Sequence, residues 1–283
     1  MILMVNLDIV HHNSYFIKTF SHKKPMNTTR HRIQFPKNEC QNADLDEAFF
    51  YLLESKGQKK IKFHDYDVIY NTPGLYEQIF YDCLKCCSPK KVTEILNTSV
   101  AQTNENFTEL RVLDVGAGNG LMGAELKKYG VSRLVGVDII PEAKRATERD
   151  RPHIYDSYDI IDLCNLDEDE EEDLSSWDLN CLTTVAALGF GDIPPKAFMV
   201  AFNIIQSEGW VAFNIKETFL NNSDESGFSR MIRDLIFSKY MDLYHLERYR
   251  HRVSIEGEPL YYFAVAGRKK YDVPKDFYDK YFD

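Results

Sequence analysis

Long apolar runs are missing from this chain of 283 residues. None approaches the roughly 20 residues that a membrane-spanning helix needs, so we expect no membrane partner. The stretch from Met1 to Asn6 is too short for the apolar core of a signal peptide, and no basic stretch precedes it. We therefore expect a cytoplasmic protein.

A basic surface is also missing. The formal net charge is −10, and the acidic run from Asp167 to Asp173 supplies seven of the negative charges. Duplex nucleic acids are bound by lysines and arginines that neutralise phosphates, so a nucleic-acid partner is not expected. The first 40 residues are more basic than the rest. We interpret them as a disordered leader rather than as a nucleic-acid-binding arm.

Cysteines are few, and their spacing favours neither a disulfide framework nor a metal site. Of the six cysteines, Cys83, Cys86 and Cys87 share one segment. No second cluster of ligands follows at the spacing of a zinc site. We expect reduced, buried thiols, no disulfides and no bound metal.

Hydrophobic periodicity divides the chain into four parts. Residues 1–43 lack sustained periodicity and are expected to form a partly disordered N-terminal extension. Residues 44–108 are expected to form a helical segment that caps the main domain at 109–270, and 271–283 form a tail. Within the cap, we expect a short helix or strand at 45–56, a short strand at 59–63, and helices at 75–87 and 92–100.

Short strands alternate with helices from Leu110 onward, which is typical of a doubly wound parallel sheet. The expected strands are 111–115, 133–137, 158–163, 177–186 and 210–215. The acidic run is expected to be a surface connection. Segments 244–254 and 260–267 predict an antiparallel hairpin. The predicted fold class is α/β: a Rossmann-like, doubly wound, seven-stranded sheet that ends in an antiparallel hairpin, with an N-terminal helical extension.

A glycine-rich turn follows the first of these strands. It comprises Asp114 at the end of the strand and then Gly116, Ala117, Gly118, Asn119 and Gly120. Glycine lets the backbone approach a ligand without a Cβ clash. The helix that begins there offers unpaired N–H groups to an anionic ligand group. The turn indicates a nucleotide-like ligand, and Asp114 is placed to act on a cationic group or to order the loop.

The stretch from Gly118 to Gly123 also matches the G-x-G-x-x-G pattern of dinucleotide sites. However, the predicted strand ends at Val115, so the tight turn begins at Gly116 rather than at Gly118. Asp114 would crowd a pyrophosphate, and the terminal hairpin is foreign to the repeated βαβ units of dinucleotide domains. These features oppose a dinucleotide site, so an NAD-dependent oxidoreductase is kept as an alternative and not as the leading hypothesis.

Two further acidic residues follow the next two strands. Asp138, with Ile139 beside it, lies about 20 residues beyond the glycine turn and can accept both hydroxyls of a ribose. A helix cap is its alternative role. Asp162 can accept the exocyclic amine of adenine, with Leu163 against the ring, or it is a loop carboxylate without a ligand. Because ligands bind beyond the carboxyl ends of parallel strands, the three acids predict one cofactor site.

At these residues the sequence resembles the class I S-adenosylmethionine (SAM)-dependent methyltransferases, over about residues 62–268. The stretch from Leu113 to Gly120 matches the first motif of that family, and Val135 to Asp138 matches the second. The chain is most similar to the small-molecule type and to Williams–Beuren-region methyltransferase-like proteins. That finer similarity rests on Tyr66-Asp67, Tyr155-Asp156, Ile161-Asp162-Leu163, Val185 to Gly189 and Pro194-Pro195. The family often has Gly where Ala187 stands, and the first 60 residues have no counterpart.

The resemblance implies SAM as the methyl donor and assigns roles to the residues above. Asp114 and the turn from Gly116 to Gly120 would hold the methionine part. Asp138 would hold the ribose, and Asp162 with Leu163 the adenine. Tyr70 and Tyr76 could close over the cofactor, where a tyrosine face stabilises a sulfonium cation. Ordinary packing is the alternative for both tyrosines.

Candidate catalytic residues follow the fourth and fifth strands. Methyl transfer from SAM is an in-line displacement, in which the protein aligns the acceptor and excludes water. A general base is needed only for an acceptor that is protonated at neutral pH. Asp192 is the first candidate for a base or substrate anchor, Phe190 for a cavity wall, Glu217 for a second base and His64 for a third. A cap or a surface charge is the alternative for each acid.

The leading hypothesis is a SAM-dependent methyltransferase that acts on a small-molecule acceptor. A protein or RNA methyltransferase is one alternative, although the chain has Ala186-Ala-Leu-Gly189 where the Asn-Pro-Pro-Tyr signature of amino-group methylation would stand. A non-catalytic SAM-fold binding module is another, with the extension or the acidic run recruiting a partner. The sequence gives no oligomeric state. It allows residues 1–43 to serve as a lid over the acceptor.

Overall fold

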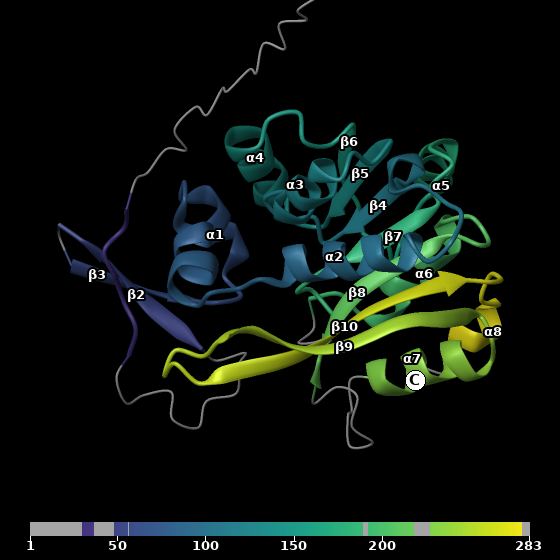
Figure 1. The fold of residues 1–283 in the computed structure, drawn as a ribbon. Helices are drawn as coiled ribbons and strands as arrows, with labels where there is room; N and C mark the ends of the chain where they lie inside the picture. The colour runs from purple at the N-terminus through teal and green to yellow at the C-terminus, as the bar shows by residue number, and fades with distance from the viewer. Residues whose placement is uncertain (1–29, 37–47, 56, 189–191, 218–226, 279–283) are drawn as a thin grey trace, which may run out of the picture.

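The computed structural model describes residues 30–36, 48–55, 57–188, 192–217 and 227–278. Two sheets organise these residues (Figure 1). The large sheet has seven strands in the order β6-β5-β4-β7-β8-β10-β9, and the small sheet has three in the order β1-β2-β3. The result is a Rossmann-like α/β fold with a small antiparallel sheet at one end.

The seven-stranded sheet confirms the predicted fold class. Its parallel strands are β4 (Arg111–Val115), β5 (Arg133–Asp138), β6 (Ser157–Ile160), β7 (Cys181–Thr184) and β8 (Trp210–Lys216). The predicted hairpin is also present, as β9 (Met241–Val253) and β10 (Pro259–Lys269), and β10 pairs antiparallel with β8. The third strand ends at Ile160, earlier than expected, so Asp162 lies in the loop beyond it.

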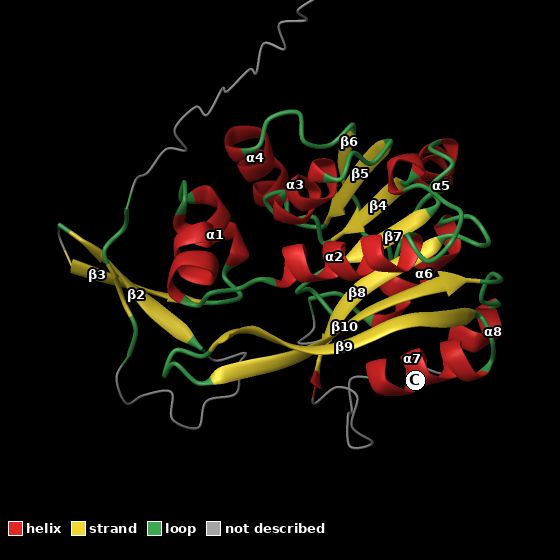
Figure 2. Cartoon of the chain, viewed as in Figure 1, coloured by secondary structure: helices red, strands yellow, loops and turns green. Residues whose placement is uncertain are grey.

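Helices cover both faces of the large sheet (Figure 2). They are α2 (Ser88–Val100), α3 (Leu121–Lys128), α4 (Pro141–Asp150), α5 (Glu168–Ser176), α6 (Pro195–Ile204), α7 (Phe228–Phe237) and the short α8 (Lys275–Tyr278). One buried cluster joins α5, α6 and α7 to the strands, and a second joins α2 and α3 to them. The strands are apolar on both faces because both faces are covered.

The N-terminal cap contains strands as well as the helical segment that was expected. It begins with β2 (Phe49–Glu54) and β3 (Gly57–Lys62), which form an antiparallel hairpin, and β1 (Ile33–Gln34) pairs with β2. The strand expected at 59–63 overlaps β3, and β2 takes the strand alternative at 45–56. Helix α1 (Tyr66–Asn71) and the π-helix η2 (Glu77–Cys83) follow. Positions 1–29 and 37–43 of the extension lie outside the described residues.

The acidic run is a helix rather than the expected surface connection. Asp167 accepts a hydrogen bond from the Glu170 backbone N–H at 2.8 Å, and the Glu170 carboxylate accepts one from the Asp167 N–H at 3.2 Å. This reciprocal capping box starts α5. Acids in the first turn are stabilised by the helix dipole, and the buried Leu174 anchors the helix to the core.

No helix in the described parts of the chain combines the length and apolar character needed to cross a membrane.

Candidate cofactor and acceptor site

A cavity of about 1050 Å³, including the open space at its mouth, lies beyond the carboxyl ends of β4, β5 and β7. Of the residues predicted from the sequence, the cavity is lined by Tyr70, Tyr76, Gly116, Ala117, Gly118, Asn119, Asp138, Ile139, Asp162, Leu163 and Asp192. Asp114, Gly120 and Glu217 do not line it.

The glycine turn brings its backbone against the cavity. Gly116 and Gly118 have φ angles of +68° and +55°, which residues with a side chain rarely adopt. A Cβ at Gly118 would lie 2.7 Å from the Tyr70 hydroxyl. Strand β4 ends at Val115, so the turn starts at Gly116, as predicted. Gly120 instead caps α3, with φ +83°.

Asp138 bridges the glycine turn and the start of α4. Its Oδ2 accepts a hydrogen bond from Gly118 N at 2.9 Å, and its Oδ1 accepts one from Ile140 N at 2.9 Å. Burial raises the pKa of Asp138, and the backbone N–H donors oppose that rise. Each carboxylate oxygen has lone pairs beyond these bonds, so the group can accept further hydrogen bonds from a ligand in the cavity.

Asp162 and Leu163 form another part of the cavity wall. The Asp162 carboxylate accepts hydrogen bonds from Asn165 Nδ2 at 2.7 Å and from Cys164 N at 2.9 Å. These donors lower the pKa of Asp162, so it is ionised at neutral pH. Leu163 is buried and offers an apolar surface beside it. Leu163 can therefore pack against a flat ring while the Asp162 carboxylate accepts a hydrogen bond from a donor at the edge of that ring.

Asp114 lies behind the cavity rather than in its wall, which corrects the expectation that it contacts the ligand. It is 1% exposed and accepts hydrogen bonds from the Tyr155 hydroxyl at 2.6 Å and from Thr183 Oγ1 at 2.7 Å. Successive side chains of a strand point to opposite sides. The side chain of Asp114 points into the protein interior, where it joins β4 to β7 and to Tyr155. Its other expected role, ordering the loop, agrees with this position.

Asp114 is expected to make stability fall as pH rises between about pH 4 and pH 6. Burial raises its pKa to about 6 in the folded chain, and the two hydroxyl donors only partly oppose this. In that range the folded chain keeps a proton that the unfolded chain has lost, so the free energy of unfolding decreases with pH by about 3 kcal/mol. Urea unfolding at several pH values measures this slope.

The matched variants for this measurement are Asp114→Asn and Asp159→Asn. The first removes the titration and keeps a side chain of the same shape, so its unfolding free energy should depend less on pH over that range. Asp159 is a less buried acid on β6 and should leave the slope unchanged. An Asp114→Asn protein with the wild-type slope contradicts the assignment.

A wall of stacked tyrosines closes the cavity on the side of the N-terminal cap. The rings of Tyr66 and Tyr70 lie 5.9 Å apart and those of Tyr70 and Tyr76 lie 5.1 Å apart, both stacked. All three rings line the cavity. Tyr66 was not among the sequence candidates, although it stands one helical turn before Tyr70. The cavity is therefore bordered on this side by three aromatic rings that are stacked on one another.

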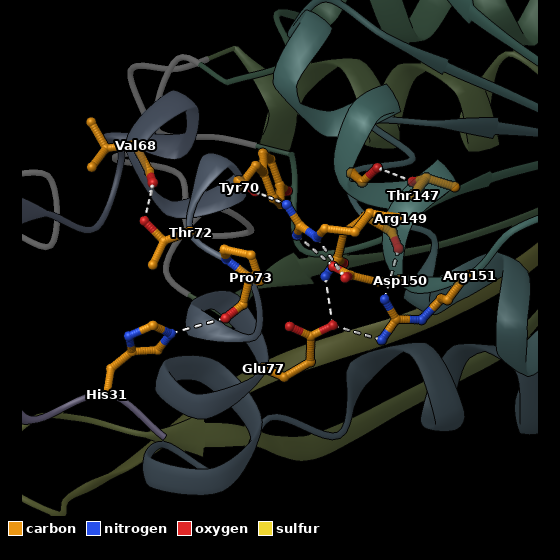
Figure 3. Close-up of polar contacts among 12 residues, drawn as sticks. His31, Val68, Tyr70, Thr72, Pro73, Glu77, Thr147, Arg149, Asp150 and Arg151 are labelled. Atoms are coloured by element: carbon orange, nitrogen blue, oxygen red, sulfur yellow. Dashed lines mark hydrogen bonds and ion pairs between the residues drawn. The ribbon is translucent and has the colours of Figure 1, made fainter. Parts of the chain in front are cut away.

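Two arginines at the end of α4 fasten this wall to the large sheet (Figure 3). Arg149 Nη1 donates to the Tyr70 carbonyl at 2.9 Å, and Arg151 Nη2 donates to Glu77 Oε1 at 2.8 Å. Asn119 Nδ2 of the glycine turn also donates to Glu77 Oε1, at 2.8 Å. The tyrosine-bearing segment and the glycine turn are therefore fixed relative to each other by charged groups.

Asp192 and His64 meet at the cavity, although they lie far apart in the sequence. His64 Nδ1 is 3.1 Å from Asp192 Oδ1, and the Tyr66 hydroxyl is 3.5 Å from Asp192 Oδ2. The first and third catalytic candidates thus form one pair. Glu217 lies elsewhere. It follows the end of β8 but does not line the cavity, and both of its carboxylate oxygens accept hydrogen bonds from Arg248, at 2.8 and 3.0 Å. Phe190 lies outside the described residues.

Metal ligands do not gather in the described ranges: no three His, Cys, Asp or Glu side chains there could hold a metal ion. Cys83, Cys86 and Cys87 are free thiols in that part of the chain. Burial raises the pKa of each thiol.

Solved structures with a similar fold include magnesium protoporphyrin IX methyltransferase from Synechocystis PCC 6803 with bound SAM (12% identity, 64% of this chain and 79% of that chain, TM-score 0.45). The N-methyltransferase NodS from Bradyrhizobium japonicum WM9 gives 15% identity, 64% and 96% coverage, and TM-score 0.44. A ribosomal protein L11 methylase from Lactobacillus delbrueckii subsp. bulgaricus gives 16% identity, coverage of 64% of this chain and 79% of that chain, and a TM-score of 0.42. No protein-family model and no curated protein matches the chain. Its function is therefore inferred from its own site.

Proposed function

We propose that this chain is a SAM-dependent methyltransferase that acts on a small-molecule acceptor. The observation that carries the proposal is the cavity in which the glycine turn, Asp138 and the stacked tyrosines meet. A strand that ends before Gly116, followed by an acid on the next strand, suits a nucleoside attached to a compact polar chain. The buried anionic Asp114 behind the turn makes the position unfavourable for a pyrophosphate.

The residues of the cavity fit the parts of SAM in turn. Asp138 accepts the ribose hydroxyls, Asp162 accepts the adenine amine with Leu163 against the ring, and the backbone of the glycine turn holds the methionine part. The stacked tyrosines Tyr66, Tyr70 and Tyr76 would lie beside the sulfonium cation, since aromatic rings favour a neighbouring cation. Burial raises the pKa of both tyrosines well above its ordinary value, so their hydroxyls stay neutral.

When bound, SAM supplies a methyl group on a positively charged sulfur. The Asp192–His64 pair accepts the proton of a hydroxyl or amine on the acceptor. SAM held by Asp138 and the glycine turn would supply the methyl carbon to the acceptor lone pair, and its sulfur would keep the electrons of the carbon–sulfur bond. A general base of this kind contributes about 10²- to 10⁴-fold to the rate.

Calorimetric titration of the purified chain with SAM, S-adenosylhomocysteine, NAD and NADP tests the cofactor. We expect SAM and S-adenosylhomocysteine to bind with micromolar dissociation constants, because several charged and polar groups converge on the cavity. NAD and NADP should not bind, since Asp114 and the early turn exclude a pyrophosphate. Binding of NAD instead would favour the oxidoreductase, and binding of none would favour a non-catalytic module.

A further inference from the structure

A second cavity, of about 570 Å³ including the open space at its mouth, adjoins the cofactor cavity. Tyr66, Tyr76, Ala186 and Asp192 line both, so these residues separate the two spaces. Apart from Ala186 and Asp192, which follow β7, the walls of the second cavity come from the N-terminal cap and from the β9–β10 hairpin. Five aromatic rings line it. Its occupant would therefore have a flat or apolar body and would lie directly beside Asp192.

Arg252 is the unusual residue of this second cavity. It is 8% exposed and sits where a β-bulge interrupts the pairing of β9 with β10. Its Nη1 donates to the Val253 carbonyl at 3.0 Å, and its guanidinium lies 5.8 Å from the centre of the Phe63 ring. Within the described residues no carboxylate lies within ion-pair distance of it. A buried guanidinium without a carboxylate partner is costly, and its remaining donors can bind an anion.

The charges around Arg252 indicate an anion with a single charge. His251, its neighbour in the cavity wall, stays neutral because burial lowers its pKa well below the ordinary value. No lysine lines the cavity, and Asp192 supplies a negative charge on its other side. Arg252 is therefore the one fixed positive charge among the described lining residues. A guanidinium matches a carboxylate with two parallel hydrogen bonds. A phosphate dianion would exceed the available positive charge.

We infer that the methyl acceptor is a small organic carboxylate with a flat or apolar body, whose carboxylate binds Arg252 and whose nucleophilic group faces Asp192. This inference rests on the proposed methyltransferase function and specifies its substrate class. Arg252 is thus a specificity-determining residue that binds a part of the acceptor other than its reacting atom. The aromatic rings that line the same cavity hold the body of the acceptor and exclude water.

The test uses benzoate as the probe and benzamide as its neutral counterpart, with the full-length chain in the presence of S-adenosylhomocysteine. Ligand-observed NMR measures the affinity of each probe for the wild type, Arg252→Met, Arg252→Lys and the control Arg250→Met. Arg250 is an exposed arginine on the same strand and lines neither cavity. Calorimetry measures S-adenosylhomocysteine binding to the same four proteins.

We expect benzoate to bind the wild type and Arg250→Met, with about 10- to 100-fold weaker binding to Arg252→Met, as expected for the loss of charged hydrogen bonds. Arg252→Lys should be intermediate, and benzamide should bind all four proteins equally weakly. The melting temperature of Arg252→Met should not fall, because an apolar side chain replaces an unpaired buried charge.

Equal benzoate affinity in the wild type and Arg252→Met, or none in either, overturns the carboxylate site. If S-adenosylhomocysteine still binds in that case, the methyltransferase proposal stands and only the carboxylate site at Arg252 is rejected. If S-adenosylhomocysteine binds none of the proteins, the methyltransferase proposal fails, and with it the role of Arg252 in holding an acceptor. A phosphate probe, phenyl phosphate, that binds more tightly than benzoate contradicts the choice of a carboxylate.

Discussion

Replacing Asp138 by alanine is expected to weaken the binding of S-adenosylhomocysteine by about 100-fold or more, because hydrogen bonds to a charged group are each worth about 1.5–3 kcal/mol. The carboxylate would accept the ribose hydroxyls while it also fixes Gly118 N and Ile140 N, at 2.9 Å each. Its loss therefore removes a ligand contact and loosens the turn that holds the methionine part. Calorimetric titration measures the change.

Two companion variants separate the ligand contact from general damage to the fold. Asp159→Ala removes an acid from the neighbouring strand β6, where it hydrogen-bonds Ser157, and should bind as the wild type does. Asp138→Asn keeps the shape but places an N–H₂ group against a backbone N–H donor, so it should also bind poorly. Wild-type affinity in a folded Asp138→Ala protein contradicts the ribose assignment.

The second large effect is expected on turnover when Asp192 is changed to asparagine. If the Asp192–His64 pair takes the proton of the acceptor, kcat should fall by about 10²- to 10⁴-fold. The affinity for S-adenosylhomocysteine should change little, since Asp138 and the glycine turn supply the cofactor contacts. Formation of S-adenosylhomocysteine from SAM in the presence of an unmethylated acceptor measures turnover, and calorimetry measures affinity.

His64→Gln and Asp67→Asn complete this comparison. His64→Gln should lower kcat as well, because its ring nitrogen lies 3.1 Å from Asp192. Asp67 is an exposed acid of α1 that lines neither cavity, and its change should leave kcat as it is. A raised KM with unchanged kcat in Asp192→Asn would show that Asp192 only anchors the acceptor.

The large sheet could be predicted from the sequence because its signals are local. Strand β4 is an apolar run that stops at a glycine turn, and its predicted bounds, Arg111 to Val115, are those of the structure. The hairpin β9–β10 was also predicted, from two segments that flank the turn-rich link Glu256 to Pro259. The acidic helix α5 was not predicted because seven consecutive acidic residues show no apolar periodicity. The capping box at Asp167 and Glu170 was the local signal that it begins there.

The site was predicted where it depends on strand ends and missed where it depends on distant contacts. Asp138 and Asp162 line the cavity because both follow parallel strands of one sheet. The direction of the Asp114 side chain depends on Tyr155 and Thr183, which no local pattern reveals. Arg252 could not be singled out, since a bulge in β9 decides that it is buried while Arg250 is exposed.

The two cavities share four lining residues, but each also has residues of its own, and this has a consequence for how the protein can change during evolution. Phe63, His64 and Arg252 line the second cavity and not the cofactor cavity. Substitutions at such positions can therefore alter which molecule is accepted without disturbing the residues around Asp138. Homologous chains could therefore differ in the substrate that they bind and still share the same residues in the cofactor cavity.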